Sequence, residues 1–234
     1  MKFWSPLAQS LILCLLQPCF ASGFPDPVVI VTLGDSITKG YRPGVARDET
    51  FSALLEKSLG AKGARVRVVN MGIGGERTDQ ALIRFDKEVV SLKPAVVTIM
   101  YGANDSYIDR GGDQPRIDKK QFGSNLRELI HRCEKMGARP ILMTSNCYGT
   151  KPNPNGAGQN PNDLLRDYME VMRGVSKETG VILIDHFDFW TRSSRKGIDV
   201  GNWTTDQLHP NPIGHQKMSD LMVDTIYKTI SNPE

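Results

Sequence analysis

Short runs of mainly apolar residues, many of them β-branched, recur along the chain. Such a run is typical of a strand that is buried on both faces, as in a parallel sheet. Five runs have this character, and they lie at residues 28–33, 66–70, 95–101, 140–145 and 181–185. We therefore predict five buried strands.

Other segments carry apolar residues at spacings of three and four, which is the pattern of an amphipathic helix. These segments lie at residues 51–59, from 122 to a stop near Gly137, from Pro161 to a stop near Gly180, and from Pro212 onward. Strands that alternate with helices favour βαβ units with right-handed crossovers. The pattern predicts the α/β class, as a three-layer α/β/α sandwich with about five parallel strands.

The N-terminus departs from this pattern. A positive start at Lys2, a short apolar centre at residues 11–16 and small residues from Ala21 to Gly23 are typical of a secretory signal peptide. A buried N-terminal helix is the alternative. We expect residues 1–23 to be a signal peptide, residues 24–234 to form a single domain, and the protein to be secreted or periplasmic.

The apolar centre of this leader is too short to span a bilayer, so we expect no stable membrane insertion. The residues before Cys19 match a lipoprotein signal poorly, so lipid anchoring is not expected either. The whole chain has 234 residues, of which 39% are hydrophobic and 24% charged, and a net charge of +3. These values are typical of a globular protein, and the small basic surplus without a basic run argues against nucleic acid as a partner.

Candidate chemistry follows the predicted strands. Ligands of open parallel sheets bind beyond the carboxyl ends of the strands. The loops there read Gly34-Asp35-Ser36-Ile37-Thr38 after the first strand, residues 70–75 after the second and Gly102-Ala103-Asn104-Asp105 after the third. A further polar segment, residues 206–210, precedes the last helix.

These segments contain the groups that acyl transfer needs. A serine hydroxyl becomes a useful nucleophile when a base removes its proton. Ser36 is the candidate nucleophile and His209 the base, and Asp206 is close enough in sequence to orient the ring. The backbone N–H groups of Ser36 and Gly75 and the side-chain amide of Asn104 are candidate donors for an oxyanion hole.

In these residues the chain resembles the SGNH (GDSL-type) hydrolase family. The four blocks of that family are matched in order by Gly34-Asp35-Ser36, by Gly75, by Gly102-x-Asn104-Asp105 and by Asp206-x-x-His209-Pro210. Gly74 stands where a serine is common, and Glu76-Arg77 where an acid-threonine pair is common. The resemblance implies a flavodoxin-like strand order, a Ser36–His209–Asp206 triad, and no metal or organic cofactor.

The expected activity is therefore that of a serine esterase acting through an acyl-enzyme. Polar loops beside the site favour a short acyl group, such as O-acetyl on a carbohydrate, with a small-molecule or carbohydrate ester as substrate. Alternatives are a lysophospholipase or thioesterase and a non-catalytic carbohydrate-binding module on the same fold. Tyr101, Asn146 and Trp203 are candidate substrate-binding residues, although ordinary loop packing explains them equally well.

Several polar residues have simpler interpretations. Asp35 and Asp105 are expected to brace loops rather than to react. His131 is expected to be exposed, His186 to pack at the end of the fifth strand, and His215 to lie on the surface or behind the site. A metal site made of His209, His215 and Asp206 is not favoured, because these residues lack a tight zinc-ligand spacing.

Overall fold

A five-stranded parallel sheet forms the centre of the molecule. The computed structural model describes Met1 and residues 26–232, so apart from Met1 the predicted signal peptide lies outside the described residues. The strand order is β2–β1–β3–β4–β5, which is the flavodoxin-like order. The strands are β1 (Val28–Gly34), β2 (Val66–Gly72), β3 (Val96–Met100), β4 (Arg139–Met143) and β5 (Ile182–Ile184).

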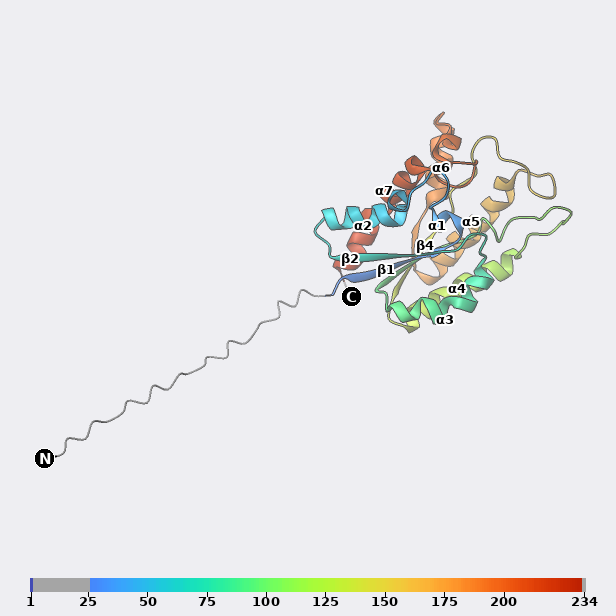
Figure 1. Cartoon of the computed structure of the whole chain (residues 1–234). Coiled ribbons are helices and arrows are strands. Elements are labelled where there is room, and N and C mark those ends of the chain that lie inside the picture. The colour runs from blue at the N-terminus through green and yellow to red at the C-terminus, as the bar shows by residue number, and fades with distance from the viewer. Residues whose placement is uncertain (2–25, 233–234) are drawn as a thin grey trace.

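Helices cover both faces of this sheet, which confirms the predicted three-layer α/β/α architecture. In Figure 1, α2 and α7 lie above the strands and α3 and α4 lie below them. The helices are α1 (Ser36–Lys39), α2 (Phe51–Ala61), α3 (Thr78–Glu88), α4 (Lys119–Lys135), α5 (Pro161–Thr179), α6 (His186–Arg195) and α7 (Pro212–Ser231), with short 3₁₀ turns η1 (Arg47–Glu49), η2 (Val90–Leu92) and η3 (Val200–Trp203). No helix among these described elements is apolar over a length sufficient to cross a bilayer.

Three helices were not predicted from the sequence, namely the four-residue α1 and the longer α3 and α6. The buried faces of α3 and α6 include polar side chains, Thr78 and Arg84 in α3 and His186 and Ser193 in α6. Apolar periodicity is therefore interrupted on the side that faces the protein interior. The predicted fifth strand also ends one residue earlier than expected, because Asp185 caps α6 by accepting a hydrogen bond from the Asp188 N–H.

The register of the central strands brings the candidate loops together. Gly34 at the end of β1 pairs with Gly72 of β2 on one side and with Met100 of β3 on the other. The loops that follow these three strands consequently start side by side. Chain connections leave β1 and β3 in opposite directions along the sheet, and such a switch point is where doubly wound sheets bind ligands.

Two histidines are enclosed by the fold. His186 begins α6 and His215 lies near the start of α7, and both side chains are completely buried. Burial lowers the pKa of each ring to about 4. The reason is that an imidazolium ion loses its hydration in the interior. Both rings are therefore neutral at neutral pH, and His215 does not lie on the surface.

We expect His186→Asn to change the pH dependence of stability. The folded wild-type ring stays neutral down to about pH 4, whereas the unfolded ring takes up a proton below its ordinary pKa of 6.5. The stabilising contribution of the neutral ring is complete above pH 6.5 and is lost as the pH falls toward 4. Relative to wild type, the variant should gain about 3 kcal/mol between pH 7 and pH 4, as measured by urea unfolding.

The matched control is His131→Asn, because His131 is exposed on α4. Its stability difference from wild type should stay flat over the same pH range. A flat difference for His186→Asn as well would contradict the assigned burial effect.

Candidate active site

Ser36 is the first residue of α1, directly after the central strand β1. Asp35 caps this short helix, since its Oδ1 accepts a hydrogen bond from the Ile37 N–H at 2.9 Å. An aspartate in this position satisfies a backbone donor that the first helical turn leaves free. The cap fixes the turn and leaves Ser36 half-buried at the carboxyl edge of the sheet.

Glycines allow this turn to lie close to its neighbours. A Cβ atom on Gly72 would overlap the backbone nitrogen of Lys39 and lie 2.6 Å from the backbone carbonyl carbon of Thr38. A Cβ atom on Gly34 would lie 2.6 Å from the carbonyl oxygen of Met100. Since no side chain fits at either position, the ends of β1 and β2 can pack directly against the backbone of α1 and the end of β3.

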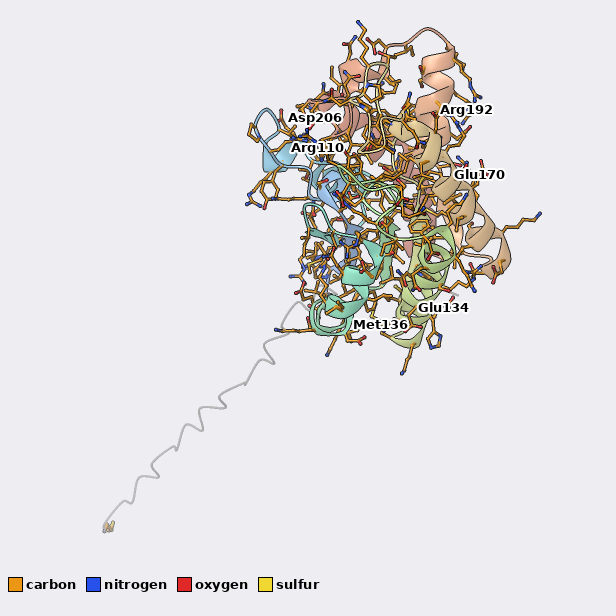
Figure 2. All side chains as sticks on the ribbon, turned by 90° about the vertical axis from the view of Figure 1, so that its right-hand side faces the viewer. Arg110, Glu134, Met136, Glu170, Arg192 and Asp206 are labelled. Atoms are coloured by element: carbon orange, nitrogen blue, oxygen red, sulfur yellow. The ribbon has the colours of Figure 1, made fainter. Side chains whose placement is uncertain are left out.

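The structure brings His209 and Asp206 to Ser36 across 173 positions of sequence. His209 Nε2 lies 2.8 Å from Ser36 Oγ, and His209 Nδ1 lies 2.8 Å from Asp206 Oδ2. Figure 2 looks onto the carboxyl edge of the sheet and labels Asp206 on that face. The three side chains therefore form one continuous line from carboxylate to ring to hydroxyl.

Local hydrogen bonds shape the loop that carries the ring. Asp206 Oδ1 accepts hydrogen bonds from the backbone N–H groups of His209 at 2.9 Å and Leu208 at 3.2 Å. Gln207 adopts a left-handed conformation with φ 71°, which turns the chain back on itself. Asn211 then caps α7, with its Oδ1 accepting from the Gly214 N–H.

The electrostatics of the pair suit a neutral base. Burial lowers the pKa of His209, although the neighbouring Asp206 carboxylate opposes this effect. Burial acts in the other direction on Asp206, but hydrogen bonds from the His209 backbone and the charge of the ring hold the pKa of this carboxyl below its usual value. An ionised Asp206 beside a neutral His209 is the state in which the ring can accept a proton at Nε2.

Asn104 lies beside the turn that carries Ser36. Its side-chain N–H donates to Asp35 Oδ2 at 3.1 Å, and its Oδ1 accepts from the Arg116 guanidinium at 3.3 Å. Arg116 is itself held by Asp109 at 2.6 Å. These partners fix which end of the amide faces Asp35, and they leave one of the two Nδ2 hydrogens free for another acceptor.

The glycine loop is joined to the same edge. The Ile73 N–H donates to the carbonyl oxygen of Gly34, two residues before Ser36 in the chain, at 3.0 Å. Gly75 is exposed and adopts φ 77°, a conformation that glycine adopts without strain. Gly75 thus lies on the exposed surface of a loop that is bonded to the turn carrying Ser36.

Behind these loops lies a group of buried acids. Asp105 accepts hydrogen bonds from the backbone N–H and the hydroxyl of Thr78 and from the Gly102 N–H, which confirms its expected bracing role. Burial raises the pKa of Asp35 to about 7, and the nearby charge of Asp105 adds to this effect. Glu76 accepts from Arg84 at 2.6 Å, so its charge is paired.

The structure corrects the three predicted substrate-binding residues. Tyr101 is completely buried and donates its hydroxyl hydrogen to Glu76 at 2.7 Å. Asn146 is also completely buried and donates to the carbonyl oxygens of Cys147 and Leu208. Trp203 is nearly buried and packs edge-on against the ring of Trp190. All three side chains pack within the loops around the site, which agrees with the alternative interpretation of ordinary loop packing.

Sequence reasoning missed two arginines that contact site residues. Arg42 forms an ion pair with Asp206 at 2.8 Å, and Arg116 contacts Asn104. Both lie in irregular segments, where no periodicity predicts the direction of a side chain.

Half-buried Tyr107 and Tyr148 lie near Arg116. Among the residues that the structure describes, no three His, Cys, Asp or Glu side chains are grouped as metal ligands.

Known proteins share this architecture. The model of the GDSL-like lipase/acylhydrolase family matches residues 32–217. The protein named uncharacterized lipoprotein YqeF of Bacillus subtilis (strain 168) is 30% identical over 197 residues, which are 76% of this chain and 76% of that protein. An acetylxylan esterase of Geobacillus stearothermophilus is 27% identical, with 80% and 88% covered. The crystal structure of the acetyl xylan esterase AlAXEase has a TM-score of 0.71 at 25% identity, with 85% and 100% covered.

We expect Gly72→Ala to destabilise the protein by about 1–3 kcal/mol, because the added methyl group has to displace backbone of α1. Thermal unfolding monitored by circular dichroism measures the effect. Gly74→Ala in the same loop is the matched control, since a Cβ there meets nothing within 4 Å. Equal melting temperatures for the two variants would contradict the packing described for Gly72.

Proposed function

Because this chain belongs to the GDSL-like lipase/acylhydrolase family, we propose that Ser36, His209 and Asp206 are the catalytic triad with which it hydrolyses a carboxylic ester. The observation that carries the proposal is the 2.8 Å contact between His209 Nε2 and Ser36 Oγ. At this distance a proton can pass directly from the hydroxyl to the ring. Asp206, on the far ring nitrogen, favours the tautomer that leaves Nε2 free to accept it.

The proposed reaction has two halves. Ser36 Oγ bonds to the carbonyl carbon while its proton moves to His209 Nε2, and the carbonyl π electrons move onto oxygen. As the oxyanion collapses, the bond to the leaving alcohol breaks, and the alcohol takes the proton from His209. The acyl group then remains on Ser36. Water repeats the sequence as nucleophile, so that the carboxylic acid is released and the free serine is restored.

Three donors are proposed to stabilise the oxyanion, namely the backbone N–H groups of Ser36 and Gly75 and the side-chain amide of Asn104. Support comes from the free Nδ2 hydrogen of Asn104 next to the Asp35-Ser36 turn, and from the exposed Gly75 loop that is bonded to Gly34. Donors that are held in place before the reaction need no reorganisation when charge develops, and this makes them effective.

The proposed substrate is an ester of a short acyl group, such as O-acetyl on a carbohydrate. The relatives named acetylxylan esterase support this choice. So do the side chains near Asn104, where half-buried Tyr107 and Tyr148 lie close to Arg116. Tyrosine combines a flat apolar ring with a polar hydroxyl, which suits contact with a sugar better than contact with a long acyl chain.

We also propose that residues 1–23 direct export, that residues 24–234 are one catalytic domain, and that the enzyme acts outside the cytoplasm. The leader pattern in the sequence supports this proposal, and one relative is named a lipoprotein. The intact mass of protein recovered from an exporting host tests for cleavage near residue 23.

We expect Ser36→Ala to lower kcat for p-nitrophenyl acetate by roughly 10⁴-fold or more, because no other hydroxyl contacts His209 Nε2 among the described residues. The variant should also lose labelling by a fluorophosphonate probe. Ser91→Ala, at an exposed position in the middle of the 3₁₀ turn η2, is the control and should retain both properties. A wild-type protein that resists the probe would favour the non-catalytic carbohydrate-binding alternative.

We expect kcat/KM for p-nitrophenyl esters to fall as the acyl chain lengthens from acetate to octanoate, because polar groups surround the nucleophile. Deacetylation of acetylated xylo-oligosaccharides should accompany activity on the acetate ester. A preference for octanoate would favour the lysophospholipase or thioesterase alternative over the acetyl esterase.

A further inference from the structure

Arg42 lies six residues after the proposed nucleophile, in the segment that connects α1 to η1. This segment is shaped by a tight reversal in which the backbones of Arg42 and Val45 exchange hydrogen bonds of 3.1 and 2.8 Å around Gly44. Gly44 has φ 87°, which permits the turn without strain. The backbone of Arg42 is therefore fixed, and its side chain starts from a defined position.

The reversal is held in place by packing against the start of α7. Gly40 precedes it with φ 72°, and a Cβ on Gly40 would lie 2.9 Å from Cε1 of the His215 ring. The His215 ring is held in turn, because its Nδ1 accepts a hydrogen bond from the Phe51 N–H at 3.3 Å. Since His215 follows His209 closely in the chain, this packing joins the segment after Ser36 to the segment after His209.

Arg42 contacts the same carboxylate oxygen that the ring uses. Its NH2 group lies 2.8 Å from Asp206 Oδ2, and His209 Nδ1 lies 2.8 Å from that oxygen. The side chains of Arg42 and Asp206 are 30% and 38% exposed. Ion pairs with this exposure contribute little to folding stability. The contact therefore acts mainly on the position and protonation of the Asp206–His209 pair, and little on folding stability.

We propose that Arg42 is a positioning residue, which fixes the Asp206 carboxylate against His209 Nδ1 and keeps the ring available as a base in mildly acidic solution. The proposal rests on the proposed function, and extends it to the pH range in which the enzyme works. Arg42 occupies one side of Oδ2 and so limits rotation of the carboxylate away from the ring. Its positive charge also opposes protonation of the imidazole.

The charged groups around His209 determine the sign of this effect. Asp206, on the same loop, favours the charged ring, and Arg42, from the segment after α1, disfavours it and lowers the pKa of His209. His215 of α7 is neutral at neutral pH, since burial lowers its pKa to about 4. Tyr148, from the loop after β4, is also neutral, because burial raises its pKa above the usual value. Burial of the ring has the largest lowering effect on the pKa of His209, and it remains when Arg42 is removed. The positive charge that adds to this effect is lost, so the pKa of His209 should rise.

The test compares Arg42→Gln and Arg42→Lys with wild type. We expect Arg42→Gln to move the acid limb of the kcat/KM profile for p-nitrophenyl acetate upward by about half a pH unit to one unit. The loss should lie mainly in kcat, with KM little changed. Arg42→Lys retains the charge and should retain most of the wild-type profile. Circular dichroism and thermal unfolding establish that each variant is folded.

The matched control is Arg47→Gln, which removes an equal charge five residues further along the chain, at the start of η1. The Arg47 guanidinium stacks on the Tyr41 ring at 3.8 Å, so this variant should leave the acid limb in place. An acid limb that is unchanged in Arg42→Gln, or that moves equally in Arg47→Gln, would overturn the proposal.

A second measurement separates this proposal from the proposed function. NMR titration of the His209 ring, assigned among the 4 histidines with a His209→Gln variant, needs no substrate. We expect the titration midpoint to rise in Arg42→Gln and to stay near wild type in Arg42→Lys. If the wild-type protein failed to hydrolyse esters while the midpoint shifted, the proposed function would fail alone. An unshifted midpoint would overturn the role of Arg42 alone.

Discussion

The carboxylate of Asp105 joins two of the loops from which the site is built. It accepts hydrogen bonds from Thr78 at the start of α3 and from Gly102 after β3, and Asn125 of α4 donates to the Thr78 hydroxyl in turn. Loops beyond parallel strands have backbone N–H groups without partners in the sheet, and a buried carboxylate can accept several of them. Asp105 thus fixes the glycine loop relative to the asparagine loop, and the proposed oxyanion donors depend on that relation.

Burying such acids has a cost in free energy, which appears as raised pKa values. Burial raises the pKa of Asp105, although hydrogen bonds from Thr78 and Gly102 oppose the shift. For Asp35 the pKa rises to about 7, and the charge of Asp105 contributes. Burial therefore favours the uncharged form of Asp35. An uncharged carboxyl next to Asn104 does not repel the negative charge that the proposed oxyanion site has to stabilise.

The sequence was sufficient to predict elements that have a repeating apolar pattern. It was insufficient where the structure depends on a single side-chain contact. Five strands and the helices α2, α4, α5 and α7 follow from periodicity, and Gly180 ends α5 as predicted, in a left-handed conformation. Helix α3 was missed because Arg84, on its buried face, pairs with Glu76. Ser36, His209 and Asp206 could be named because their residue types and spacing suggest a reaction. The positions of Arg42 and Arg116 depend on loop conformation, and no local pattern in the sequence predicts that conformation.

Backbone hydrogen bonds attach segment 148–160 to two of the loops that form the proposed site. The segment 148–160 contacts the His209 loop through Gly149, whose N–H donates to the Gln207 carbonyl oxygen at 2.7 Å. It contacts the Asn104 loop through Gly156, whose N–H donates to the Ile108 carbonyl oxygen at 2.8 Å. A side chain at Gly156 would overlap the backbone of Asp109. Because backbone contacts hold this segment on both sides, its exposed side chains can change without separating His209 from Asn104. Replacing those exposed side chains should therefore leave the geometry of the proposed triad unchanged.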